Sequence, residues 1–156
     1  MEYVDHGRRS LLGTAALTLA AAQIAGVASS FGAAALPPLK PGANASFPSL
    51  RQVDAGEVRM GYAEVGPSDG PVVILLHGWP YDIYSFVDVA PLLAAQGYRV
   101  IVPYLRGYGS TRFLSADTVR NGQPSAVASD IVALMDALKI DQATRAGFDW
   151  GARTGD

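Results

Sequence analysis

The sequence predicts an open α/β sheet, and three observations support this prediction. Two short strands come first, a continuously apolar strand and a second buried strand follow, and segments with helical periodicity separate the later strands. Strands that alternate with helical segments form sheets joined by right-handed crossovers, with helices packed on the faces. We therefore expect a mostly parallel sheet flanked by helices.

The first predicted element is a hairpin. Residues Leu50–Val53 and Glu57–Val65 have the composition of two strands, joined across the turn Asp54-Ala55-Gly56. In the second strand every other residue from Val58 to Tyr62 is apolar. This alternation is typical of a strand that is buried on one face.

A buried strand, a helix and a second buried strand are predicted next. Val72–Leu76 is apolar throughout, which is typical of a strand covered on both faces of a parallel sheet. A helix is expected from Val89 to Gln96, with Asp88 placed to cap its first turn and Gly97 placed to end it. The next strand is expected over Tyr98–Val102.

A second helix and a last strand complete the predicted fold. The helix is expected from about Ser125 to Lys139, because its apolar residues recur at the spacing of one helical face. The last strand is expected over Ala143–Gly147. The residues of the apolar helical face are Val127, Ile131, Leu134 and Leu138.

The N-terminal segment, residues 1–35, is interpreted as an export signal. Arg8 and Arg9 precede an uncharged apolar run. Ala33-Ala34-Ala35 fits the pattern of small residues, A-x-A, at which signal peptides are cleaved. The segment resembles a twin-arginine signal, which implies a bacterial protein exported to the periplasm or secreted. The alternative is an uncleaved membrane anchor, and membrane contact is expected only through this segment.

Composition narrows the domain organisation and the functional class. Four prolines in residues 36–49 indicate a linker, which leaves residues 50–156 for the folded domain. The formal charge of −2 gives no indication of a nucleic-acid surface. The chain has no cysteine, so disulfide and thiolate chemistry are excluded.

The candidate catalytic motif is Gly147-Phe148-Asp149-Trp150-Gly151, directly after the last predicted strand. It resembles the nucleophile elbow of the α/β-hydrolases, a tight turn from strand to helix that needs small residues on both sides of the nucleophile. Esterases and lipases have Ser at the centre of this turn, whereas this chain has Asp149. The resemblance therefore identifies Asp149 as the candidate nucleophile.

An aspartate nucleophile indicates a reaction class. Its carboxylate is ionised at neutral pH and needs no base for its first attack. Attack on an ester would give a labile anhydride, whereas displacement at a saturated carbon gives an ester on Asp149 itself. A small apolar epoxide or alkyl halide is therefore the expected substrate, and a serine-type esterase is not expected. Hydrolysis of the ester then requires a base and an oxyanion hole.

Two upstream loops strengthen the resemblance. His77-Gly78-Trp79-Pro80 resembles the HGxP loop of epoxide hydrolases and related dehalogenases, and Arg106-Gly107-Tyr108-Gly109-Ser110 resembles their RGYGxS loop. The resemblance implies that the main-chain N–H groups of Trp79 and Trp150 bind the oxyanion. In the family that this chain resembles, the acid that opens the ring is a Tyr of the cap domain, so Tyr108 is not assigned that role. The residues expected to shape the loops and the elbow are His77, Gly78, Pro80, Arg106, Gly107, Gly109, Gly147 and Gly151. For Arg106 a solvated loop charge is the alternative.

The sequence also departs from the family pattern. The family has a cap, a second acid and a late catalytic His, whereas the histidines here are His6 and His77. Arg145 stands in the last strand, where an apolar residue is usual and a buried unpaired charge would be costly.

We expect the N-terminal part of an epoxide hydrolase-type enzyme that needs no cofactor or metal and is inactive as this fragment. The alternatives are a haloalkane dehalogenase-like hydrolase and a non-catalytic truncated remnant.

Overall fold

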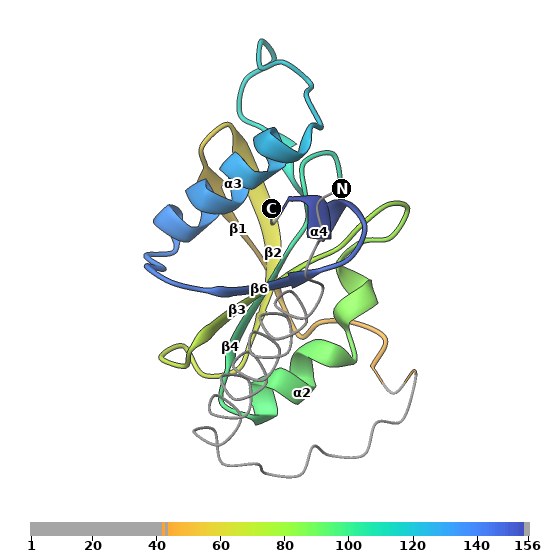
Figure 1. The fold of residues 1–156 in the computed structure, drawn as a ribbon, viewed down its shortest axis with the longest axis vertical. Coiled ribbons are helices and arrows are strands. Elements are labelled where there is room, and N and C mark those ends of the chain that lie inside the picture. Colours follow the sequence, from red (N-terminus) through yellow and green to blue (C-terminus); the bar gives the residue numbers. More distant parts are fainter. Residues whose placement is uncertain (1–41, 43, 155–156) are drawn as a thin grey trace, which may run out of the picture. The chain divides into compact units, whose positions relative to one another are not determined.

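The computed structural model describes residues 42 and 44–154 (Figure 1). The predicted signal and half of the predicted linker lie outside the described residues. Strands and helices alternate along the described chain, as the sequence predicts. In chain order the elements are β1 (Leu50–Ala55), β2 (Val58–Val65), β3 (Val72–Leu76), the 3₁₀ helix η1 (Ile83–Phe86), α2 (Val89–Ala95), β4 (Arg99–Pro103), β5 (Arg112–Phe113), α3 (Pro124–Ala137), β6 (Thr144–Gly147) and α4 (Trp150–Arg153).

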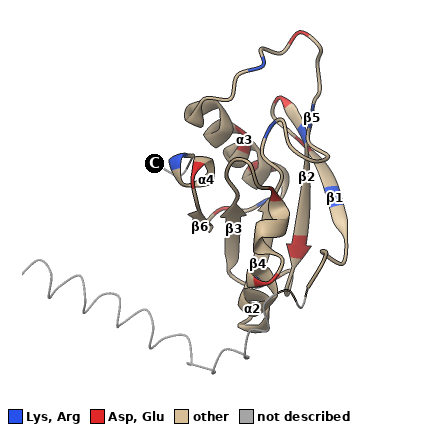
Figure 2. Ribbon diagram, turned by 90° about the vertical axis from the view of Figure 1, so that its right-hand side faces the viewer, with Lys and Arg blue, Asp and Glu red and all other residues tan. Residues whose placement is uncertain are grey.

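The strands form one mixed sheet of six strands in the order β1-β2-β4-β3-β6, with β5 also paired to β2. Figure 2 shows β6, β3, β4, β2 and β1 side by side in this order. Strand β3 is parallel to both β4 and β6, whereas β2 is antiparallel to β1, β4 and β5. The predicted α/β fold is confirmed. The sheet is mixed rather than mostly parallel, because the hairpin and the short β5 add antiparallel pairs.

Both faces of the central strands are buried, and successive residues face opposite layers. Ile74 and Leu76 of β3 pack in a cluster with the apolar face of α3. Val73 and Leu75 pack in a second cluster with Ile83 of η1 and with α2. The continuous apolar run of β3 is therefore explained by helices on both sides of the sheet.

Several local predictions need correction. The hairpin turn is tighter than expected, because β1 extends to Ala55 and only Gly56 and Glu57 separate the strands; Gly56 has a φ of 57°. Asp88 makes no side-chain cap on α2. Its carboxylate accepts hydrogen bonds from Gly42 N–H and from the main chain and side chain of Asn44 instead. Asp88 thus anchors the segment that precedes β1.

The last strand of the described chain also differs from expectation. All four residues of β6 are exposed, Arg145 included, so the expected buried charge does not occur. The Arg145 guanidinium lies 3.5 Å from the main-chain oxygen of Thr154. No helix within the described residues is long and apolar enough to cross a bilayer.

Candidate active site

The loops that follow β3, β4 and β6 all lie at the carboxyl ends of these parallel strands. Leu76 and Gly147 are paired in register at the ends of β3 and β6, so the chain segments that follow them leave the sheet side by side. The first segment begins with His77 and the second contains Asp149. Ligands of open α/β sheets bind at this edge. The topology therefore places the two loops predicted to hold the nucleophile and the oxyanion donors next to one another.

Asp149 occupies a strained turn between β6 and α4. Its φ of 52° and ψ of −118° lie outside the regions that residues with a side chain usually adopt. A Cβ at Gly151 would lie 2.1 Å from the main-chain oxygen of Leu76, and one at Gly147 would lie 2.7 Å from the same atom. The two glycines are thus required because the turn presses against the end of β3.

The Asp149 carboxylate is exposed and is held by main-chain donors. The N–H of Trp79 donates a hydrogen bond to Oδ1 over 2.9 Å. This N–H has the largest effect in lowering the pKa of the Asp149 carboxyl below its ordinary value; the N–H of Trp150 comes next, and the charge of Arg153 adds to both. The Asp149 carboxyl group is therefore ionised at neutral pH.

The loop after β3 approaches the elbow closely at Gly78. A Cβ at this position would lie 2.5 Å from Cβ of Asp149 and 2.8 Å from its Oδ1. The following Trp79–Pro80 peptide bond is cis. Only a residue without a side chain allows the Trp79 N–H to reach the carboxylate, so Gly78 is a steric requirement of the site.

His77 is completely buried beneath this loop. Its Nε2 accepts a hydrogen bond from the N–H of Leu105 over 3.2 Å, and its ring contacts the edge of the Tyr108 ring with centroids 4.7 Å apart. Burial lowers the pKa of the imidazole. His77 thus joins the loop after β3 to the loop after β4, and it has no free nitrogen directed at Asp149.

Arg106 is buried and is not a solvated loop charge. Its guanidinium donates two hydrogen bonds of 2.6 Å to the Asp130 carboxylate of α3, and it also donates to the carbonyl oxygens of Asn121 and Ala126. The glycines that follow, Gly107 and Gly109, have φ values of 89° and 47°. Arg106 therefore fixes the loop after β4 to α3.

The sequence analysis did not identify Asp130 as the partner of Arg106. The available signal was an acidic residue on the apolar face of the predicted helix, between Val127 and Ile131. Such a residue is expected to be buried, and a buried carboxylate needs a cationic partner.

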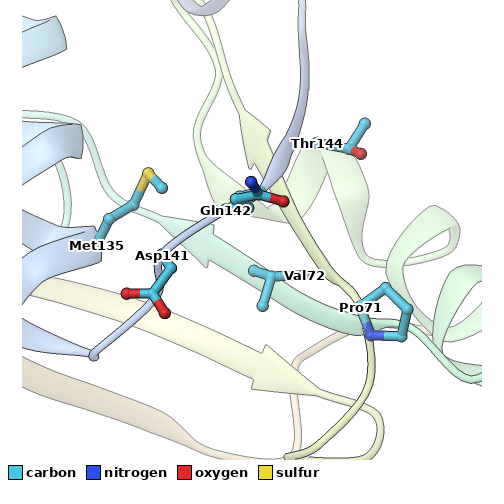
Figure 3. A pocket seen from close by; sticks show the side chains of 7 residues that line it. Pro71, Val72, Met135, Asp141, Gln142 and Thr144 are labelled. Carbon is cyan, nitrogen blue, oxygen red and sulfur yellow. The ribbon is translucent and has the colours of Figure 1, made fainter.

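Two cavities differ in their position relative to Asp149. The larger, of about 630 Å³, is lined by residues that include Val72 and Thr144, which begin β3 and β6 (Figure 3). It lies at the opposite end of these strands from Asp149. The smaller, of about 160 Å³, is lined in part by Trp150 and Tyr108. Of these two cavities, the smaller adjoins the elbow.

Comparison with known proteins shows consistent similarities. The alpha/beta hydrolase fold family matches residues 71–155. Epoxide hydrolase A of Mycobacterium tuberculosis is 37% identical over 105 residues, which cover 67% of this chain and 32% of that protein. A haloalkane dehalogenase of Mycobacterium marinum is 32% identical over 119 residues, which cover 71% of this chain and 37% of that protein.

A solved structure is similar in both fold and sequence. A crystal structure of a Klebsiella pneumoniae protein assigned as an epoxide hydrolase has a TM-score of 0.69 and 69% sequence identity, over 70% of this chain and 36% of that chain. The chain thus spans about a third of the length of these relatives.

Proposed function

The chain belongs to the α/β-hydrolase fold family, and on this premise we propose that it supplies the nucleophile and the oxyanion donors of an epoxide hydrolase-type reaction. The observation that carries the proposal is the 2.9 Å hydrogen bond from the Trp79 N–H to Oδ1 of Asp149. It joins the two motifs that the reaction needs, a carboxylate nucleophile and a donor for the charge on its ester.

The first step is displacement at a ring carbon of the epoxide. Oδ1 of Asp149 is engaged by the main-chain donor, so Oδ2 is the oxygen that attacks. A bond forms between Oδ2 and the carbon, the ring C–O bond breaks, and the released alkoxide oxygen takes a proton from solvent water. The product is a hydroxyalkyl ester on Asp149, with Oδ1 as its carbonyl oxygen.

The second step is attack of water on this ester. Negative charge then develops on Oδ1, where the N–H groups of Trp79 and Trp150 stabilise it without moving. The attacking water must lose a proton to a base. His77 does not serve, because it is buried and its Nε2 accepts the Leu105 N–H. His6 lies in the predicted export signal. We therefore propose that the 156-residue chain forms the ester once and does not turn over.

Mass spectrometry of the intact chain tests this proposal. Incubation with a small epoxide should add one epoxide mass, and peptide mapping should place it on Asp149. Asp149→Asn should abolish the addition, whereas Asp141→Asn, which removes another exposed carboxylate, should not. Steady production of diol by the purified chain, or an addition on another residue, would contradict the proposal.

A haloalkane dehalogenase-like reaction is the second candidate. Trp150 follows Asp149 and is 38% exposed; the resemblance to haloalkane dehalogenases implies that an indole N–H at this position helps to hold the leaving halide. An alkyl bromide should then alkylate Asp149 and release bromide, whereas an epoxide should not react. If neither reagent labels Asp149, the chain is a non-catalytic remnant.

We also propose that residues 1–35 direct export, on the basis of Arg8, Arg9 and the uncharged run that follows. Expression of the chain in a bacterium and separation of the periplasm test this. Replacement of both arginines by lysine should retain the chain in the cytoplasm. Unchanged export of the double variant would contradict a twin-arginine signal, and recovery in the membrane fraction would support the anchor.

A further inference from the structure

The loop that connects β5 to α3 contains the dipeptide Asn121-Gly122, and it projects beyond the sheet (Figure 1). Both residues lie outside helices and strands; Asn121 is half-buried and Gly122 is exposed. A Cβ at Gly122 would meet no heavy atom within 4 Å, so packing does not require a glycine there. The absence of a side chain does, however, leave the main-chain nitrogen of Gly122 open to the neighbouring side chain of Asn121.

Two hydrogen bonds polarise the carbonyl groups on either side of this nitrogen. The N–H of Gln123 donates to Oδ1 of Asn121 over 2.9 Å, and the turn that this bond closes contains both Cγ of Asn121 and the Gly122 nitrogen. The Arg106 guanidinium donates to the main-chain oxygen of Asn121 over 2.8 Å. The first bond makes Cγ more electrophilic and stabilises negative charge on Oδ1. The second makes the Gly122 N–H, which belongs to the same peptide unit, more acidic.

We propose that Asn121-Gly122 is a self-modification site, at which Asn121 loses its amide and becomes an isoaspartyl residue. The Gly122 nitrogen gives up its proton to solvent and forms a bond to Cγ. The bond from Cγ to Nδ2 then breaks, and ammonia leaves with a proton taken from water. The product is a cyclic imide that contains Cγ and the main-chain carbonyl carbon of Asn121. This inference does not depend on the proposed function.

The contact with Arg106 determines how water opens the imide. Attack at Cγ breaks the bond from Cγ to the nitrogen and gives aspartate, whereas attack at the main-chain carbonyl carbon breaks the other C–N bond and gives isoaspartate. The guanidinium stabilises the charge that develops on the main-chain oxygen. The Gln123 N–H acts on the other carbonyl, but a charged donor forms the stronger bond. Isoaspartate also leaves a free carboxylate opposite Arg106, so this product is favoured.

The modification changes the surroundings of the smaller cavity. Isoaspartate inserts one methylene into the main chain and adds one negative charge, directly before Gly122 and opposite Arg106. Both of these residues line the cavity that adjoins the elbow. The wall of this cavity is therefore expected to change with the age of the chain.

Peptide mapping of the full chain after storage in mildly alkaline buffer tests the proposal. The peptide with Asn121 should exchange ammonia for water, and fragmentation spectra should distinguish isoaspartate from aspartate. The ratio of isoaspartate to aspartate should be at least about tenfold higher in the folded chain than in the same chain unfolded in guanidinium chloride, because one hydrogen bond from a charged donor supplies about this factor. Equal ratios in the two states would overturn the proposal.

The rate of ammonia loss provides a second measurement. Asn44 is the control within the same chain, because it precedes Ala45, whose methyl group obstructs ring closure. Asn121 should be converted while Asn44 remains intact. Gly122→Ala, which adds a methyl group where space is open, should slow the conversion of Asn121 several-fold. An undiminished rate in Gly122→Ala, or earlier conversion of Asn44, would overturn the proposal.

Arg106→Lys separates the effect of the guanidinium from that of the turn. An ammonium lacks the planar fork that holds Asp130 and the Asn121 oxygen together. The isomer ratio should therefore fall toward that of the unfolded chain, whereas Arg59→Lys, at an exposed pair, should keep the original ratio. An unchanged ratio in folded Arg106→Lys would overturn the proposal. If circular dichroism shows this variant to be unfolded, the comparison of the folded and unfolded original chain decides.

Discussion

The main-chain N–H of Leu105 donates a hydrogen bond to Nε2 of His77 across 3.2 Å, in a fully buried position. An acceptor at Nε2 requires the ring proton on Nδ1, which faces the carbonyl oxygen of Gly78 at 3.4 Å. This carbonyl and the Trp79 N–H belong to one peptide unit and point in opposite directions. His77 thus holds the orientation in which the Trp79 N–H faces Asp149.

The first prediction concerns stability at mildly acidic pH. Burial lowers the pKa of His77 in the folded chain, so the folded state binds fewer protons than the unfolded state just below pH 6.5. The stabilising contribution is therefore complete above about pH 6.5 and is lost as the pH falls below this value. Urea unfolding should give a lower free energy at pH 5.5 than at pH 7.5.

His77→Gln is the matched variant, because its side-chain oxygen can still accept from Leu105 but does not titrate. The variant should be less sensitive to pH over this interval than the original chain. An equal loss of stability in both chains would show that other groups cause the dependence.

The second prediction concerns the pH dependence of ester formation. The donors around Asp149 hold the pKa of its carboxyl below the ordinary value of 3.8. The Asp149 carboxyl group is ionised above that pH, so the rate at which an alkyl bromide labels it should be constant from pH 5 to pH 8. An alkyl bromide is the suitable reagent because, unlike an epoxide, it is not activated by protonation. A rate that rises through this interval would place the carboxyl pKa near neutrality and contradict the site geometry.

The third prediction concerns Gly78. A methyl group there would overlap Cβ and Oδ1 of Asp149, and relief of the overlap must move the Trp79 N–H away from the carboxylate. Gly78→Ala should lower the free energy of unfolding by about 1–3 kcal/mol, as overpacking does. It should also raise the pKa of Asp149 toward its ordinary value, measured from the carboxyl resonance in an NMR titration. Gly122→Ala, at an open position, should do neither.

Local sequence patterns predicted most of the helices and strands, and each of these predictions rested on residues within or next to the element. The continuous apolar run gave both bounds of β3, and the helical spacing of Val127, Ile131 and Leu134 predicted α3, whose buried face contains these three residues. Gly97 ends α2 with a φ of 87°. These features depend on neighbours within a few residues.

Features that depend on distant partners were not predicted. Strand β5 has two residues and exists through its pairing with Val58 and Arg59 of β2. The Asp88 carboxylate binds Asn44, 44 residues away, rather than the adjacent helix. In the candidate site, the elbow was identifiable from its motif, whereas the buried partner of Arg106 lies 24 residues further along the chain. Which distant residue a side chain or strand will pair with cannot be read from the periodicity of the sequence.

The last prediction tests this buried pair. The side chains of Arg106 and Asp130 are 5% and 3% exposed, so removal of one partner leaves a charge buried without its counter-ion. Arg106→Met should lower the free energy of unfolding by about 3–5 kcal/mol. The exposed pair of Arg59 and Asp54, each 54% exposed, provides the comparison, and Arg59→Met should cost less than about 1 kcal/mol.

A double variant separates the charge from the packing. Arg106→Met combined with Asp130→Leu leaves neither charge in the interior, so it should be more stable than Arg106→Met alone. If the double variant is instead less stable than either single variant, packing and the two main-chain acceptors dominate. Because Leu105 precedes Arg106 and holds His77, Arg106→Met should also shift the Trp79 amide resonance. An unshifted resonance would show that the loop after β4 holds its position without the ion pair.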